Sequence, residues 1–229
     1  MRPPFVALPL FALAGCSNIP GGPEGVVAIE VRVPAPPLLE VGDTIQLSAR
    51  ALSQSGDSVA ATVVWRAADT TLSIDGGGRA TALVPSGFGR VQATVGTLVS
   101  SLVSLQLTPH ADTIALPGPD TLRVPLGTDT SAALVAQVLS FNPAGGVFGA
   151  RLTYQLDPAS VPALEFVGGG AGKTVRTASD GGPLTPVRLH RLSTPTLPDS
   201  AVITVQAFRP SGNEVPPLGG VRFTVRFDN

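Results

Sequence analysis

The sequence predicts an all-β fold, with two antiparallel β-sandwich domains in tandem along the 229 residues. Three observations lead to this prediction: polar and apolar residues alternate over short segments, turn-forming clusters separate these segments, and part of the pattern occurs twice. The length fits one large domain or two of ordinary size, because a domain usually has roughly 100–200 residues.

Alternation with a period of two is the signature of a strand that buries one face. It is clearest over residues 221–227, where valine and phenylalanine alternate with arginine and threonine, and it recurs over 27–33, 45–51 and 103–107. After residue 25, no segment keeps apolar residues at helical spacing for ten positions. Antiparallel pairing is therefore expected, since a parallel sheet needs helices to cover it.

Turn-forming residues stand between the predicted strands. The chain has 26 glycines and 23 prolines, which argues against long helices. They gather in clusters such as 55–57, 75–78, 142–146 and 210–213, where glycine and proline supply the φ angles of chain reversals. Short strands at near-regular spacing between such turns suggest a sandwich or a barrel.

Part of the pattern is repeated in the second half of the chain. The segment 47–53 aligns with 134–140, and further on Val63-Val64-Trp65 is echoed by Leu152-Thr153-Tyr154. Matches in the same order indicate a duplicated architecture. The sequence thus predicts one domain over 26–108 and a second over 111–229, on either side of Pro109.

The first predicted domain resembles the bacterial immunoglobulin-like domains of group 2. The resemblance rests on Leu39–Ala49, on Val64-Trp65, on Gly78–Leu83 and on Val91–Val95, in that order. Residues 111–229 resemble an immunoglobulin-like module in general pattern only. The resemblance implies an immunoglobulin-like sandwich of a cell-surface protein.

Trp65 and Tyr154 are the candidate core residues of the two domains. We expect Trp65 on the strand that crosses the centre of the first sandwich, where an aromatic of this size removes about 150–250 Å² from water. Tyr154 takes the equivalent place in the second domain, and its hydroxyl then needs a partner or access to solvent. With a single cysteine in the chain, apolar packing has to replace an inter-sheet disulfide.

Residues 1–15 are similar to the signal peptide of a bacterial lipoprotein. The apolar run Phe5–Ala14 is shorter than the ~20 residues of a membrane-spanning helix. Leu13-Ala14-Gly15-Cys16 resembles a lipobox, which implies that Cys16 carries a lipid anchor. An ordinary signal peptide with a chance cysteine is the alternative. Residues 16–25 are expected to form a tether. Ser17 replaces the Asp of the inner-membrane retention signal, so the resemblance implies the outer membrane.

No catalytic, cofactor-binding or metal-binding residue is predicted. His110 and His190 are the only histidines, which excludes a zinc site of the usual composition. The segment Gly168–Thr174 looks like a phosphate loop, but Val167 occupies the position of its first glycine. Calcium at a domain end remains an open alternative, with aspartates at four predicted turns: Asp43, Asp57, Asp69 and Asp75.

The net charge of −1, with 14% charged residues, argues against a nucleic-acid partner. The predicted function is that of a non-enzymatic cell-envelope protein, bound to the membrane through Cys16 and serving adhesion, protein interaction or a structural stalk. A surface carbohydrate-binding module and an accessory subunit of an envelope complex are the alternatives. The partner is then the membrane together with an envelope protein or a glycan.

Overall fold

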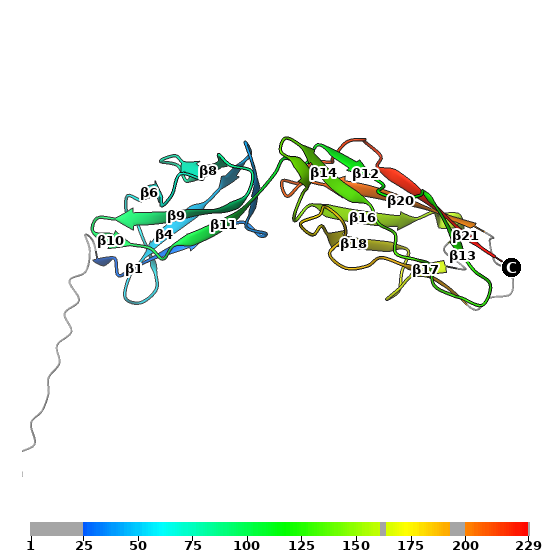
Figure 1. Ribbon diagram of the computed structural model, residues 1–229. Coiled ribbons are helices and arrows are strands. Elements are labelled where there is room, and N and C mark those ends of the chain that lie inside the picture. The colour runs from blue at the N-terminus through cyan, green and yellow to red at the C-terminus, as the bar shows by residue number, and fades with distance from the viewer. Residues whose placement is uncertain (1–24, 161–163, 193–199, 229) are drawn as a thin grey trace, which may run out of the picture.

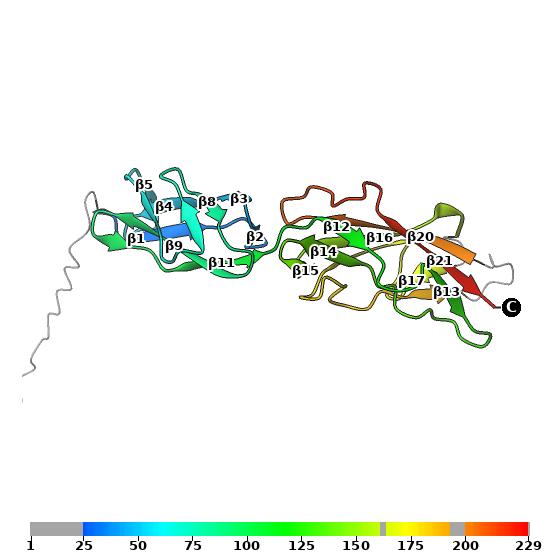
Figure 2. The same cartoon turned by 45° about the horizontal axis from the view of Figure 1, so that its top comes forward.

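The computed structural model describes residues 25–160, 164–192 and 200–228 of the chain. Strands form two β-sandwiches that lie end to end, the first at the left of Figure 1 and the second at the right; Figure 2 shows the same order. Within the described residues, strand ladders join only strands of the same sandwich. The predicted all-β fold with two sandwiches is confirmed.

One layer of the first sandwich consists of β1 (Ala28–Arg32), β3 (Thr44–Gln46), β4 (Ser48–Leu52), β5 (Ser58–Val59), β7 (Leu72–Ile74) and β8 (Arg79–Ala82). β4 pairs with β1 and β5, whereas β3, one residue upstream of β4, pairs with β8 and through it with β7. The predicted strand over 45–51 is therefore divided at Leu47, whose amide donates to the carbonyl oxygen of Gly78 at 2.9 Å.

The facing layer of the first sandwich consists of β2 (Leu38–Glu40), β6 (Val64–Ala67), β9 (Gly87–Val95), β10 (Leu98–Val99) and β11 (Val103–Thr108). β11 lies between β9, its antiparallel partner, and β2, its parallel partner. β9 also pairs with β6 and β10. The N-terminal segment of the domain thus contributes to both layers, because β1 joins one layer and β2 joins the other.

The second sandwich repeats this arrangement. One layer contains β12 (Thr113–Ala115), β14 (Gln137–Phe141), β15 (Ala144–Gly146), β17 (Leu164–Phe166) and β19 (Leu189–Arg191). The other contains β13 (Thr121–Val124), β16 (Arg151–Leu156), β18 (Gly172–Arg176), β20 (Ser200–Phe208) and β21 (Val221–Phe227). One short 3₁₀ turn, η2 (Pro158–Ser160), follows β16.

Three pairings of the first sandwich have counterparts in the second. β12 pairs antiparallel with β14, as β1 does with β4. β13 pairs parallel with β21, the last strand, as β2 does with β11. β16 pairs with β20, as β6 does with β9. Apart from the parallel pairs β2–β11 and β13–β21, the named strands pair antiparallel, and two such layers form an immunoglobulin-like sandwich.

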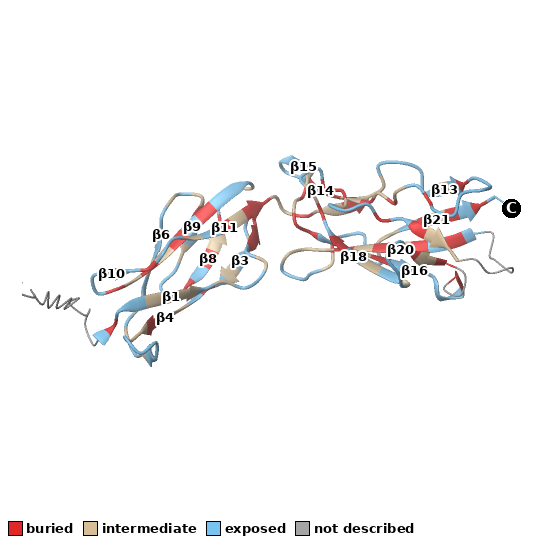
Figure 3. Ribbon diagram, turned by 90° about the horizontal axis from the view of Figure 1, so that it is seen from below, coloured by how far each residue is buried: buried red, intermediate tan, exposed pale blue. Residues whose placement is uncertain are grey.

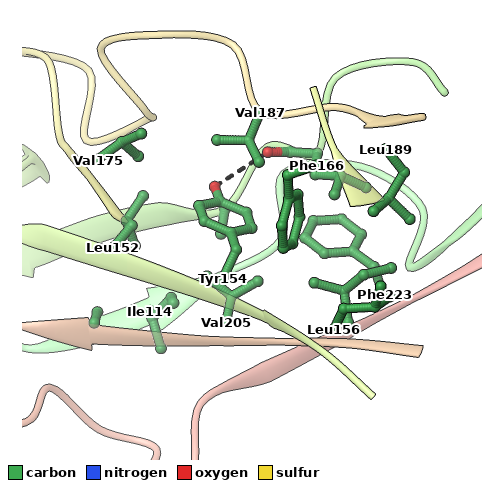
Figure 4. Close-up of a cluster of buried hydrophobic side chains, with 14 of the residues drawn as sticks. Ile114, Leu152, Tyr154, Leu156, Phe166, Val175, Val187, Leu189, Val205 and Phe223 are labelled. Carbon is green, nitrogen blue, oxygen red and sulfur yellow. Dashed lines mark hydrogen bonds between the residues drawn. The ribbon is translucent and has the colours of Figure 1, made fainter. Parts of the chain in front are cut away.

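Buried residues lie on strands of both layers of each sandwich (Figure 3), and they form core clusters within each sandwich. In the second sandwich, Tyr154 is fully buried and its ring meets Phe166 edge-to-face, with the ring centroids 6.4 Å apart (Figure 4). The Tyr154 hydroxyl donates to the carbonyl oxygen of Leu134 at 3.1 Å. In the first sandwich, Trp65 is half-buried and packs against the margin of the core.

Candidate functional site at the domain junction

The predicted lipidation residue, Cys16, lies outside the described residues, as do the predicted signal peptide and all but the last residue of the predicted tether. Trp65 and Tyr154 lie on corresponding strands, β6 and β16. The indole ring of Trp65 rests on Gly78: a Cβ there would lie 2.9 Å from the ring and 2.8 Å from the carbonyl oxygen of Leu47. Both aromatic residues therefore have structural roles: Tyr154 is fully buried in its core, and Trp65 lies at the margin of its core.

The glycine-rich segment that resembles a phosphate loop connects β17 to β18. Its backbone closes on itself, because Phe166 donates to Gly170 and Gly169 donates to Phe166. Lys173 lies on β18, not at the start of a helix, and its Nζ donates to the carbonyl oxygen of Val167 at 3.2 Å. The lysine thus holds its own turn, whereas the lysine of a phosphate loop points to a ligand.

Three of the four aspartates at predicted turns satisfy donors of their own turns. Asp75 accepts hydrogen bonds from the amides of Gly77 and Arg79. Asp69 accepts from Thr71 and from the guanidinium of Arg90; the Thr71 hydroxyl, ahead of Arg90, lowers its pKa.

Asp57 is the third of these aspartates, and Asp43 is the exception. Asp57 accepts a hydrogen bond from Ser55, and Asp43 lies at the domain junction. Within the described part of the chain, no three histidine, cysteine, aspartate or glutamate side chains gather closely enough to hold a metal ion.

His190 and His110 lie in different surroundings. The Nδ1 atom of His190, on β19, lies 3.8 Å from Oε1 of Glu165 on β17. His110 lies between the sandwiches, where its Nδ1 is 2.8 Å from Oδ1 of Asp112 and its Nε2 is 2.7 Å from Nη1 of Arg209. A guanidinium can only donate, so Nε2 accepts and the neutral imidazole donates through Nδ1 to Asp112.

This geometry differs from that of a catalytic histidine–aspartate pair. In such a pair, the ring nitrogen opposite the aspartate accepts a proton from a nucleophile or from water. Here Arg209 occupies that nitrogen. The Asp112 carboxylate also accepts a hydrogen bond from the amide of Phe141 at 2.7 Å, and that amide, ahead of His110, lowers the pKa of Asp112. The group ties together the linker, β14 and the turn after β20.

Apolar contacts and one hydrogen bond complete the junction. Leu38 of β2 packs against Gly149 of the second sandwich; a Cβ at this glycine, whose φ is +79°, would lie 2.5 Å from Cδ1 of Leu38. The buried hydroxyl of Thr108 donates to the carbonyl oxygen of Phe148 at 3.1 Å. The two sandwiches therefore meet through specific contacts and not only through the linker.

Glu40 is the unusual residue of the junction, and sequence reasoning missed it. It ends β2, its exposed fraction is only 1%, and neither carboxylate oxygen has a hydrogen-bond partner. Its nearest cation is Arg209, whose Nε lies 4.0 Å from Oε2. A groove of about 230 Å³ runs beside it between β2 and the turn at Pro210 and Ser211. The sequence Leu38-Leu39-Glu40 gives little indication of a buried acid, because a strand that buries one face would expose every second residue to water.

Within the described residues, no helix has the length and apolar character needed to cross a membrane. No family model and no curated protein sequence matches the chain. Solved structures with similar folds include the adhesin InvE of Yersinia pseudotuberculosis, at 15% identity and a TM-score of 0.42, covering 91% of this chain. The chain spans 62% of the length of that adhesin structure.

Two further solved structures are similar at comparable levels. Domains 4 and 5 of the S-layer protein SbsC match at 14% identity and a TM-score of 0.34, covering 89% of this chain and 99% of that one. The fibronectin(III)-like modules of Clostridium thermocellum CbhA match at 15% identity and a TM-score of 0.37, covering 86% and 93%. At these values each is a protein to which this chain is similar in fold.

Proposed function

We propose that this chain is a non-enzymatic cell-envelope protein, anchored by a lipid on Cys16, that holds its second sandwich away from the membrane for protein interaction or adhesion. The observation that carries the proposal is the end-to-end arrangement of the sandwiches. The first described residues lie at the outer end of the first sandwich, and the chain end marked C lies at the far end of the second (Figure 1). An anchor at Cys16 makes the second sandwich the distal one.

The polar side chains of the described residues support the non-enzymatic part of the proposal. The histidine–aspartate pair at the junction is tied to Arg209, and Lys173 is tied to its own turn. Two or three acyl chains on Cys16 bind a membrane without a spanning segment, since each buried methylene contributes about 0.8 kcal/mol.

Incorporation of labelled palmitate in intact cells tests the anchor. We expect label in the wild-type protein and none in Cys16→Ala, with Ser17→Ala as the matched control that keeps the label. Ser17→Asp should move the labelled protein from the outer to the inner membrane in fractionated cells. Equal labelling of Cys16→Ala and wild type would refute lipidation at this residue.

Glycan binding is a second candidate function, favoured by one surface. Phe88 on β9 is 60% exposed, beside a shallow hollow that it lines with Asp69, Thr71, Arg90 and Ser104. An exposed ring next to hydrogen-bonding side chains is an arrangement that stacks on sugars. Binding to a glycan array that Phe88→Ala abolishes would support this function, with Phe141→Ala as a control at another exposed ring. Absence of binding across a broad array would exclude it.

A further inference from the structure

The Glu40 carboxylate is buried at the junction without the contacts that normally accompany a buried charge. Buried ionised groups in proteins are paired and hydrogen-bonded, because removing a charge from water is costly. Neither oxygen of Glu40 has a hydrogen-bond partner of normal geometry, and the Nε of Arg209 also lacks one. Burial raises the pKa of Glu40, and the nearby backbone amide of Ala111 offsets only a small part of this rise. The closed junction therefore accommodates a neutral Glu40 better than an ionised one.

The charged groups around Glu40 do not compensate its charge fully. Arg209, from the turn after β20, is attractive at 4.0 Å, but one of its Nη atoms is committed to His110. Asp43, which follows β2, repels the Glu40 carboxylate, and His110 of the linker attracts it only when protonated. These three are the titratable and charged groups that face Glu40 from the packed elements.

We propose that the junction is a pH-sensitive elbow, in which ionisation of Glu40 favours separation of the two sandwiches and protonation favours their contact. Separation hydrates the carboxylate and breaks the contacts of Leu38 with Gly149 and of Thr108 with Phe148. The first sandwich, its linker and the second sandwich keep their own folds in both states, because each core lies within one sandwich.

The direction and size of the effect follow from the two protonation states. Burial raises the pKa of Glu40 to about 6 in the closed junction, from 4.5 for an ordinary glutamate, and Arg209 offsets only part of this rise. A group whose pKa is raised stabilises the closed form below its ordinary pKa and loses that contribution as the pH rises through about 6. The ratio of closed to open molecules then falls by up to about 30-fold between pH 4 and pH 8.

His110 is another titratable group at the junction, and its contacts differ from those of Glu40. Its Nε2 accepts from Arg209 and its Nδ1 lies 2.8 Å from Oδ1 of Asp112, so both ring nitrogens have partners. The side chain of His110 is 37% exposed, whereas Glu40 is almost completely buried and neither of its oxygens has a hydrogen-bond partner. The buried Glu40 carboxylate is therefore the group that couples closure of the elbow to acid.

Distances between spin labels on the two sandwiches test the proposal. The labels are attached at Ser86→Cys and Ala144→Cys, both exposed, in the full chain carrying Cys16→Ser so that no other thiol is present. We expect a narrow distance distribution at pH 5 and a broad one at pH 8. Glu40→Gln, which is uncharged at every pH, should give the narrow distribution at both.

Two variants serve as controls for the origin of the pH effect. Glu30→Gln removes an exposed carboxylate far from the junction and should behave as the wild type. His110→Asn should keep the wild-type difference between pH 5 and pH 8, since Glu40 and its neighbour Arg209 remain. The proposal is overturned if the wild-type distribution is the same at both pH values, if it is broader at pH 5, or if Glu40→Gln retains the wild-type response.

Discussion

The two sandwiches share one strand topology but differ in the depth of their cores. Among the described residues, the second sandwich buries 24 apolar side chains in one continuous cluster, whereas the first has clusters of eight and three. Tyr154 and Phe166 are fully buried in the second, while Trp65 of the first is half-buried. Similar strand pairings thus enclose cores of different size, and the stability of each domain depends on how much aromatic and aliphatic surface it buries.

The largest expected difference between the sandwiches comes from truncating the corresponding aromatics. Tyr154→Ala should destabilise the second sandwich by about 3–5 kcal/mol, the range for removal of a fully buried aromatic. Trp65→Ala should cost the first sandwich only about 2 kcal/mol, because part of the side chain already faces water at the margin of the core. Hydrogen exchange in urea, followed separately in each sandwich, measures both. Equal losses would show that the two cores are equivalent.

A smaller effect isolates the hydroxyl of Tyr154. Tyr154→Phe should destabilise the second sandwich by about 1 kcal/mol at pH 7, since it leaves the Leu134 carbonyl without its donor. Burial raises the pKa of Tyr154 to about 12, from 10.0. Ionisation of Tyr154 is therefore less favourable by about 3 kcal/mol in the folded state than in the unfolded state, so the fold keeps its full stability below pH 10 and loses up to this amount as the pH rises through about 12.

Alkaline unfolding checks this sign. The second sandwich of the wild type should lose stability between pH 10 and pH 12, and that of Tyr154→Phe should lose less over the same interval. A variant that follows the wild-type profile would show that another group controls alkaline unfolding.

The smallest expected effect is at the surface of the first sandwich. Glu30 on β1 forms ion pairs with Arg32 and Arg50, and its hydrogen bond from Arg50, followed by that from Arg32, lowers its pKa. All three side chains are exposed, so solvent and salt screen the pairs. Glu30→Gln should leave the urea midpoint of the first sandwich unchanged within error. A clear shift of the urea midpoint would mean that these surface ion pairs stabilise the first sandwich.

Local patterns predicted much of the fold. β21 occupies Val221–Phe227, the segment with the clearest alternation, and β11 occupies the predicted segment from Val103. The echo between Trp65 and Tyr154 corresponds to strands with matching partners. These features were readable because a strand that buries one face carries its periodicity in its own residues.

The junction was not readable in the same way. Arg209 and His110 are 99 positions apart, and their contact depends on how the second sandwich meets the linker. The burial of Glu40 also depends on that docking, because β2 is a short edge strand of three residues. The periodicity of a segment therefore cannot predict the burial of a side chain when another domain provides its surroundings.

The parallel pairing of each first strand with the last strand has a mechanical consequence. β2 and β11, like β13 and β21, run in the same direction near the entry and the exit of their domain. If the chain is held through the proposed anchor at Cys16 and pulled at the second sandwich, the tension slides these strands along each other. All hydrogen bonds of the ladder then bear the load together and do not open one by one.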